Sequence, residues 1–173
     1  MKISLRLFIT AIISLFCVGC DQASKQYAAH YLPEDHMQSY LYDVVRIGYT
    51  ENTGAFLGMG SNLSPEHRFW LFSVFAGLLL AGLFAYLLLH KPASTVSIAG
   101  FALILSGGGS NLYDRLINNG AVIDFLNVGF SSLRTGIFNV ADMAIMAGAV
   151  LVVFAGSNSG KSDSPDQLEH NSH

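Results

Sequence analysis

Two aspartates lie in apolar surroundings, where a carboxylate is expensive to keep. Asp142 stands inside Ile137–Phe154, an otherwise uncharged run, and Asp124 lies inside the apolar stretch Val122–Leu126. Such residues mark a candidate functional site, because an isolated ionised carboxylate is strongly disfavoured in hydrocarbon. Two neighbouring carboxylates at low dielectric cannot both ionise, so one keeps a proton and the pair can act as general base and general acid around one water. This is the chemistry of aspartic peptidases.

A structural interpretation of Asp142 remains open beside the chemical one. A carboxylate near a helix N-terminus can bind the free backbone N–H groups and interact favourably with the helix dipole. Counted from the start of its apolar segment, Asp142 lies about five residues into the helix, or about 7 Å along the helix axis. The sequence alone does not decide between the two interpretations.

Other polar side chains are expected at the same edge of the membrane as the two aspartates. They are Asn52, Asn111, Asp114, Arg115 and Asn139. Asn111 and Arg115 are four residues apart and so share one face of a helix. Amides, a guanidinium and carboxylates gathered at one edge are what a peptide-binding notch requires. Taken singly, each asparagine can instead cap a helix, and Asp114 can form an ion pair with Arg115.

The composition is that of a membrane protein. Of the 173 residues, 51% are hydrophobic and only 12% are charged, whereas soluble domains average roughly 25% charged residues. The mean hydropathy is +0.44. The net charge of -3 and the scattered cations exclude a nucleic-acid-binding surface. Two cysteines, Cys17 and Cys20, are too few for a disulfide framework.

Long apolar runs predict four transmembrane helices, at about residues 7–29, 69–89, 94–113 and 137–155. Between the first two, the sequence SYLYDVVRIGYT followed by ENTG is typical of a strand that enters a tight turn. We therefore predict an all-α membrane protein with a small extracytoplasmic β-sheet on the membrane surface and a short periplasmic helix or loop. The small-residue run Ser106–Ser110 predicts close helix packing or an opened helix end.

The domain organisation and orientation follow from charge and composition. Residues 1–156 are predicted to form one integral membrane domain, and the polar residues 157–173 a disordered cytoplasmic tail. Lys2, Arg6, Lys91 and Lys161 flank the spans on one side. Because lysine and arginine in short flanks stay cytoplasmic, both termini are expected in the cytoplasm. The aspartates and the polar cluster then lie near the periplasmic face.

Five blocks of sequence, in order, resemble the motifs of lipoprotein signal peptidase, also called signal peptidase II. They are Asp21–Lys25, Asn52–Phe56, Asn111–Arg115, Val122–Phe125 and Phe138–Asp142. The resemblance extends from the first span to the fourth and omits only the tail. Two departures concern local helix geometry: Ser106 and Ser110 replace usual glycines, and RTGIFN lacks a common aromatic-proline pair.

The resemblance implies an aspartic endopeptidase of the bacterial inner membrane. Such an enzyme removes the signal peptide from prolipoproteins on the N-terminal side of a diacylglyceryl-modified cysteine, without a metal or cofactor. Asp124 and Asp142 match the catalytic pair, and Asp21 and Lys25 match supporting residues. Substrate contacts are implied for Asn52, Gly54, Asn111, Asp114, Arg115 and Asn139. The implied partners are diacylglyceryl-modified prolipoproteins and membrane lipid, and the protein is expected to be a monomer.

Three other functions fit parts of the sequence. The C-x-x-C spacing of Cys17 and Cys20 is compatible with a thiol oxidoreductase, although a second cysteine pair is missing. The N-terminal segment, ending at Cys20, resembles the leader of a lipoprotein. A mature lipoprotein is usually a soluble domain behind its leader, and the three later spans argue against such a domain here. A proton-coupled transporter also uses intramembrane carboxylates, but no internal repeat is detectable.

Overall fold

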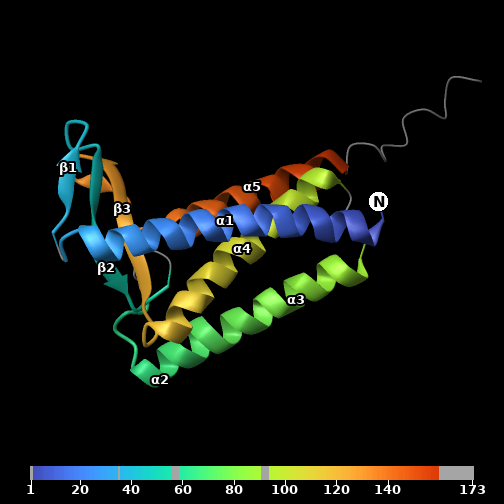
Figure 1. Ribbon diagram of the computed structural model, residues 1–173, viewed down its shortest axis with the longest axis horizontal. Coiled ribbons are helices and arrows are strands. Elements are labelled where there is room, and N and C mark those ends of the chain that lie inside the picture. Colours follow the sequence, from blue (N-terminus) through green and yellow to red (C-terminus); the bar gives the residue numbers. More distant parts are fainter. Residues whose placement is uncertain (1, 35, 56–58, 91–93, 160–173) are drawn as a thin grey trace, which may run out of the picture.

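The computed structural model, which describes residues 2–34, 36–55, 59–90 and 94–159, is a helical bundle with a small sheet at one end (Figure 1). Within these residues, four helical stretches are long and apolar enough to cross a membrane. They are α1 (Ile3–Tyr31), the continuous run of α2 (Pro65–Arg68), η2 (Phe69–Phe75) and α3 (Ala76–Leu89), α4 (Thr95–Ile117), and α5 (Val140–Ser159). The predicted fold class of four membrane-spanning helices with a small sheet is therefore confirmed.

The helix ends differ from the apolar runs that predicted them. α1 and α4 extend beyond the predicted spans to Tyr31 and Ile117, because a helix continues wherever its backbone hydrogen bonds and packing allow, whatever the hydropathy. α5 begins at Val140, so Asp142 is the third residue of the helix and the predicted depth of about five residues was wrong. α5 ends at Ser159, which makes the first part of the predicted tail helical. The rest of that tail, together with Phe56, Lys91 and Lys161, lies outside the described residues.

The close approach of α4 and α5 depends on glycines in both helices. A Cβ atom added to Gly107 would lie 2.4 Å from the carbonyl oxygen of Ala141, and one added to Gly148 would lie 2.5 Å from that of Gly100. α4 is a continuous helix through the small-residue run. The prediction of close packing is therefore confirmed, and the alternative of an opened helix end was wrong.

At the end of the bundle opposite the sheet, Arg6 of α1 secures the C-terminal end of α3 (Figure 1). Its buried guanidinium donates to the carbonyl oxygen of Leu87 (3.2 Å) and to that of His90. The last carbonyl groups of a helix lack partners within the helix and carry a partial negative charge, so a cation there satisfies both needs. The N-terminus of α1 and the C-terminal end of α5 also lie at this end of the molecule.

The sheet contains four antiparallel strands in the order of the chain. They are β1 (Gln38–Tyr40), β2 (Val45–Asn52), β3 (Val122–Phe130) and β4 (Leu133–Arg134). Asp124 of β3 lies opposite Thr50 of β2, two pairs from the end of the ladder at Asn52 and Val122. The sequence predicted one strand through SYLYDVVRIGYT, but residues 41–44 form a turn that divides it into β1 and β2, and β2 continues through Glu51 and Asn52. The strand that carries Asp124 was interpreted only as an apolar patch. Pairing with β2 is what fixes Asp124 at the sheet end of the bundle.

We predict that Gly107→Ala separates the start of α5 from α4. The added methyl group meets a backbone carbonyl that cannot move without shifting α5, so the variant should lose about 1–3 kcal/mol of stability. Gly109→Ala is the matched control, because a Cβ there meets nothing within 4 Å and replacing a helical glycine gains about 0.5–1 kcal/mol. Thermal unfolding in detergent should therefore rank Gly109→Ala at or above the unsubstituted protein and Gly107→Ala below it. Equal melting temperatures for the two variants would contradict the packing described.

Candidate active site

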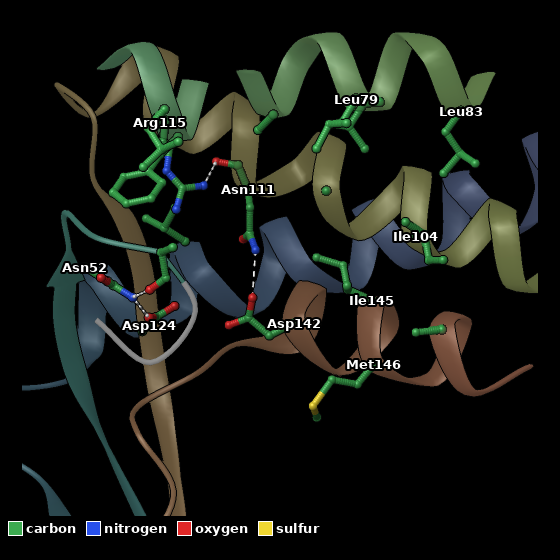
Figure 2. A pocket seen from close by; sticks show the side chains of 18 residues that line it. Asn52, Leu79, Leu83, Ile104, Asn111, Arg115, Asp124, Asp142, Ile145 and Met146 are labelled. Atoms are coloured by element: carbon green, nitrogen blue, oxygen red, sulfur yellow. Dashed lines mark hydrogen bonds between the residues drawn. The ribbon is translucent and has the colours of Figure 1, made fainter. Parts of the chain in front are cut away.

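The chain brings Asp124 and Asp142 together by pairing the entry to α5 with β3. Phe138 donates its N–H to the carbonyl oxygen of Leu126 (2.8 Å) and accepts from the N–H of Leu126 (2.9 Å). The helix that follows therefore begins beside the strand that carries Asp124. Figure 2 shows both aspartates at the same end of one cavity, arriving from different elements. Asp124 is 1% exposed and Asp142 is 8% exposed.

Asn139 links the two carboxylates directly. As the N-cap of α5 it accepts from the N–H of Asp142 (2.9 Å) and donates its own N–H to Asp142 Oδ2 (3.3 Å). These reciprocal bonds form a capping box. The side-chain amide of Asn139 also donates to Asp124 Oδ1 (2.7 Å). The structural interpretation of Asp142 is therefore confirmed by the cap. The capped side chain also lies on the cavity wall, where the chemical interpretation requires it.

The remaining carboxylate oxygens each receive one more amide donor. Asn52 Nδ2 donates to Asp124 Oδ2 (2.9 Å), and Asn111 Nδ2 donates to Asp142 Oδ1 (2.9 Å) (Figure 2). Every oxygen of the pair therefore has a fixed donor, and the orientation of both carboxylates is set before any substrate is bound.

Burial raises the pKa of Asp124 from its ordinary value to about 7, with the hydrogen bond from Asn52 acting against this rise. The nearby charge of Asp142 also raises it, while the hydrogen bond from Asn139 and the charge of Lys25 lower it. A carboxyl group with this pKa keeps its proton close to neutral pH. A carboxyl pair in which one member keeps its proton can act as general acid and general base.

A buried ionic cluster stands behind the asparagines. Lys25 is 1% exposed, and its Nζ lies 2.7 Å from Asp21 Oδ2 and 2.8 Å from Asp114 Oδ2. It also donates to Asn111 Oδ1 (2.8 Å), which leaves the amide nitrogen of Asn111 pointing at Asp142. Lys25 thus fixes which end of the Asn111 amide faces the pair.

The same cluster joins α1 to the start of α5. Asp21 Oδ1 accepts from the backbone N–H of Ala141 (2.7 Å), one residue before Asp142. Asp21 Oδ2 also accepts from the hydroxyl of Ser110 (2.7 Å), and Gln22 donates to both Ser110 and Asp114. From the sequence, Ser110 was interpreted as part of the small-residue run and as a departure from glycine, and Gln22 was not singled out. Ser110 lies four residues before Asp114, on the same helix face, which is the signal that could have revealed it.

Arg115 holds the loop after β2 against the site. Its Nη2 donates to the carbonyl oxygen of Gly54 (2.8 Å), and its guanidinium lies 5.9 Å from the centre of the Phe72 ring. The N–H of Gly54 donates to Asn52 Oδ1 (2.9 Å). Asp114 binds Lys25 rather than Arg115, so the ion pair considered from the sequence is replaced by the buried cluster. Phe72 was not singled out from the sequence, where it is one apolar residue of a long apolar run.

The cavity has a polar end and an apolar end. Its volume is about 550 Å³. Asn52, Asn111 and Arg115 line it beside the aspartates. Gly54 and Asn139 do not line it but form hydrogen bonds with Arg115 and Asp124, and Asp114 binds Lys25 of the buried cluster. Towards the other end of the bundle the walls are apolar, as Figure 2 shows for Leu79, Leu83, Ile104 and Met146. The arrangement suits a ligand with a polar backbone segment followed by an apolar one.

Neither cysteine lines this cavity. Cys17 is buried and Cys20 is exposed on α1, and both thiols are free. Within the described part of the chain, no group of three or more His, Cys, Asp or Glu side chains could hold a metal ion.

A family model described as signal peptidase (SPase) II matches residues 13–157. The chain belongs to the signal peptidase II family. A lipoprotein signal peptidase of Streptococcus pneumoniae is 30% identical over 147 residues, which cover 85% of this chain and 91% of that protein. One from Pseudoalteromonas translucida is 36% identical over 143 residues, which cover 82% and 84%. The family indicated by the five sequence blocks is thereby confirmed.

Solved structures show the same fold. A bacterial membrane enzyme superposes with a TM-score of 0.78 at 22% identity, over 92% of this chain and 94% of that one. A second bacterial membrane enzyme gives a TM-score of 0.70 at 23% identity, over 84% and 90%. This signal peptidase II family member is accordingly a multi-pass membrane protein of known architecture.

We predict that Lys25→Met destabilises the fold far more than an exposed lysine substitution. Loss of the ammonium leaves Asp21 and Asp114 buried without a cation, and breaking a buried ion pair in this way costs about 3–5 kcal/mol. Lys2→Met is the matched control because Lys2 is exposed. Thermal unfolding in detergent should show a large drop for Lys25→Met and little change for Lys2→Met. A Lys25→Met protein as stable as the control would show that the cluster does not hold the helices together.

Proposed function

We propose that this chain is a membrane aspartic endopeptidase that removes the signal peptide from prolipoproteins by cleaving on the N-terminal side of a diacylglyceryl-modified cysteine. Family membership supports signal peptide removal from prolipoproteins. The observation that carries the aspartic mechanism is the pairing of Asp124 and Asp142 through Asn139 at the polar end of an apolar cavity.

In the proposed reaction the pair holds one proton and one water. The ionised carboxylate takes a proton from the water as its oxygen attacks the scissile carbonyl carbon, and the protonated carboxyl group donates a hydrogen bond to the carbonyl oxygen. The tetrahedral intermediate collapses when the leaving nitrogen receives a proton from the pair. The products are the carboxylate of the signal peptide and the free amine of the modified cysteine.

The cavity accounts for the proposed substrate. Arg115 and Asn52 hold hydrogen-bonding groups beside the pair, where an extended peptide backbone would lie. The apolar walls of α3, α4 and α5 offer a surface for the hydrophobic part of a signal peptide. The diacylglyceryl chains can stay in lipid, so the protein needs to hold only the peptide.

We further propose that the protein lies in the bacterial inner membrane as a monomer with both termini in the cytoplasm. Lys2 and Arg6 stand at the end of the bundle where α1 begins and α5 ends, and cationic flanks stay cytoplasmic. The aspartates, which lie at the sheet end of the bundle, are then near the periplasmic face.

Replacing either aspartate should remove the activity and leave the fold intact. Asn keeps the shape of the side chain but cannot carry the shared proton, so Asp124→Asn and Asp142→Asn should each lower turnover by at least about 100-fold. The measurement is release of a signal-peptide-sized fragment from a diacylglyceryl-modified precursor by protein purified in detergent. Glu51→Gln, an exposed carboxylate on the same sheet, is the control and should cleave normally. Substantial cleavage by a purified Asp124→Asn or Asp142→Asn protein would refute the aspartic mechanism.

The activity should decline as the pH rises through about 7. The pKa of Asp124 is raised to about 7, so the shared proton is present below that pH and is lost above it, giving a descending alkaline limb in kcat/KM. At low pH the second carboxylate gains a proton and activity falls again. A profile measured across neutral pH with the modified precursor tests this. Activity that keeps rising above pH 7 would contradict a pair that works with one proton.

A further inference from the structure

The end of the sheet farthest from the bundle presents two turns with exposed apolar side chains. We call these turns, residues 41–44 and residues 130–133, the sheet tips. Leu41 is 71% exposed and Tyr42 is fully exposed in the first, while Phe130 is 76% and Leu133 is 84% exposed in the second. The two tips adjoin, because the N–H of Gly129 donates to the carbonyl oxygen of Val44 (2.9 Å). Together they form one apolar patch.

The first tip is held in an unfavourable backbone conformation. Leu41, Tyr42 and Asp43 have φ angles of 50°, 54° and 67°, in the left-handed region that residues with a side chain rarely occupy. Three such residues in succession persist only where the surroundings enforce the conformation. Side-chain bonds to Asp43 do this: its carboxylate binds Arg46 (2.7 Å) and lies near Arg134 (3.4 Å). The strain keeps two large apolar side chains directed away from the protein.

The position of the tips shows what can cover them. In Figure 1 the strands run across the direction of the helices, so the tips project sideways past the bundle at its sheet end rather than onward along its axis. A membrane crossed by the four helices has its surface in that same sideways plane. Tyrosine, phenylalanine and leucine beside arginine are the residues that favour the boundary between headgroups and acyl chains. The two arginines share a single carboxylate, which leaves positive charge next to the patch.

We propose that the sheet tips insert into the outer surface of the lipid bilayer that the helices span and anchor the sheet to it. Leu41, Tyr42, Phe130 and Leu133 enter the interfacial region, and Arg46 and Arg134 lie at the level of the lipid phosphates. The anchor fixes the tilt of the sheet, and with it β2 and β3, relative to the membrane. This inference does not depend on the chemistry proposed for the cavity.

Fluorescence quenching by brominated phospholipids tests the insertion. The single tryptophan is replaced (Trp70→Phe), and Tyr42→Trp or Leu133→Trp places a new one in either tip. The proteins are reconstituted into phospholipid bilayers with or without bromine atoms on the acyl chains near the headgroups. The fluorescence of both tip variants should be quenched strongly by the brominated lipid. Their emission maximum in the bilayer should lie at a shorter wavelength than that of a tryptophan exposed to water.

Glu51→Trp in the same background is the matched control. Glu51 is exposed on β2 and, one residue from Asn52, points to the opposite face of the sheet. Its tryptophan should remain unquenched. The proposal is overturned if the tip variants are quenched no more than this control, which is the result expected if a second copy or a soluble partner covers the tips. Quenching of one tip alone would also overturn it, since the two form one patch.

Discussion

The cost of burying charge without a partner governs how this molecule is built around its two aspartates. Asp124 and Asp142 lie where water is largely excluded, and both must keep fixed donors on their oxygens. Neutral amides supply these donors. An arginine or lysine in direct contact would favour the ionised form of both carboxylates, whereas asparagines orient the carboxylates without adding a charge. The nearest buried cation of the cluster, Lys25, contacts Asn111 and not the aspartate pair itself.

The residues around the two aspartates therefore form two groups, an inner group of asparagines and an outer ionic cluster. The inner group, Asn52, Asn111 and Asn139, forms hydrogen bonds with the two aspartates. The outer cluster around Lys25 contacts Asn111 and forms ion pairs with Asp21 and Asp114. The outer cluster joins α1, α4 and the first turn of α5, so the same bonds that hold the bundle together also place Asp142. The glycines of α4 contribute by letting α5 approach closely enough for those bonds to form. Stability and geometry at the site therefore depend on the same contacts.

Much of this was predictable from the sequence, for definite physical reasons. Long apolar runs fix the number of spans, and the unusual position of two carboxylates in apolar surroundings identifies Asp124 and Asp142 as residues that need partners. Lys25 was indicated only by the family resemblance. The partners themselves depend on tertiary structure. That Asp114 binds Lys25 and not its neighbour Arg115 follows from the rotation of α4 against α1, which no local spacing encodes. The strand around Asp124 was missed because its pairing with β2 spans seventy or so residues of chain.

The central claim is that the buried pair carries one proton near neutral pH. Infrared spectroscopy of the purified protein, titrated from about pH 5 to about pH 9, observes the C=O stretch of a protonated carboxyl group directly and without substrate. The account predicts that this band disappears with a midpoint near pH 7 and that the Asp124→Asn protein lacks this transition. A protein whose aspartates are fully ionised throughout the titration, with no such band in any spectrum, would contradict it.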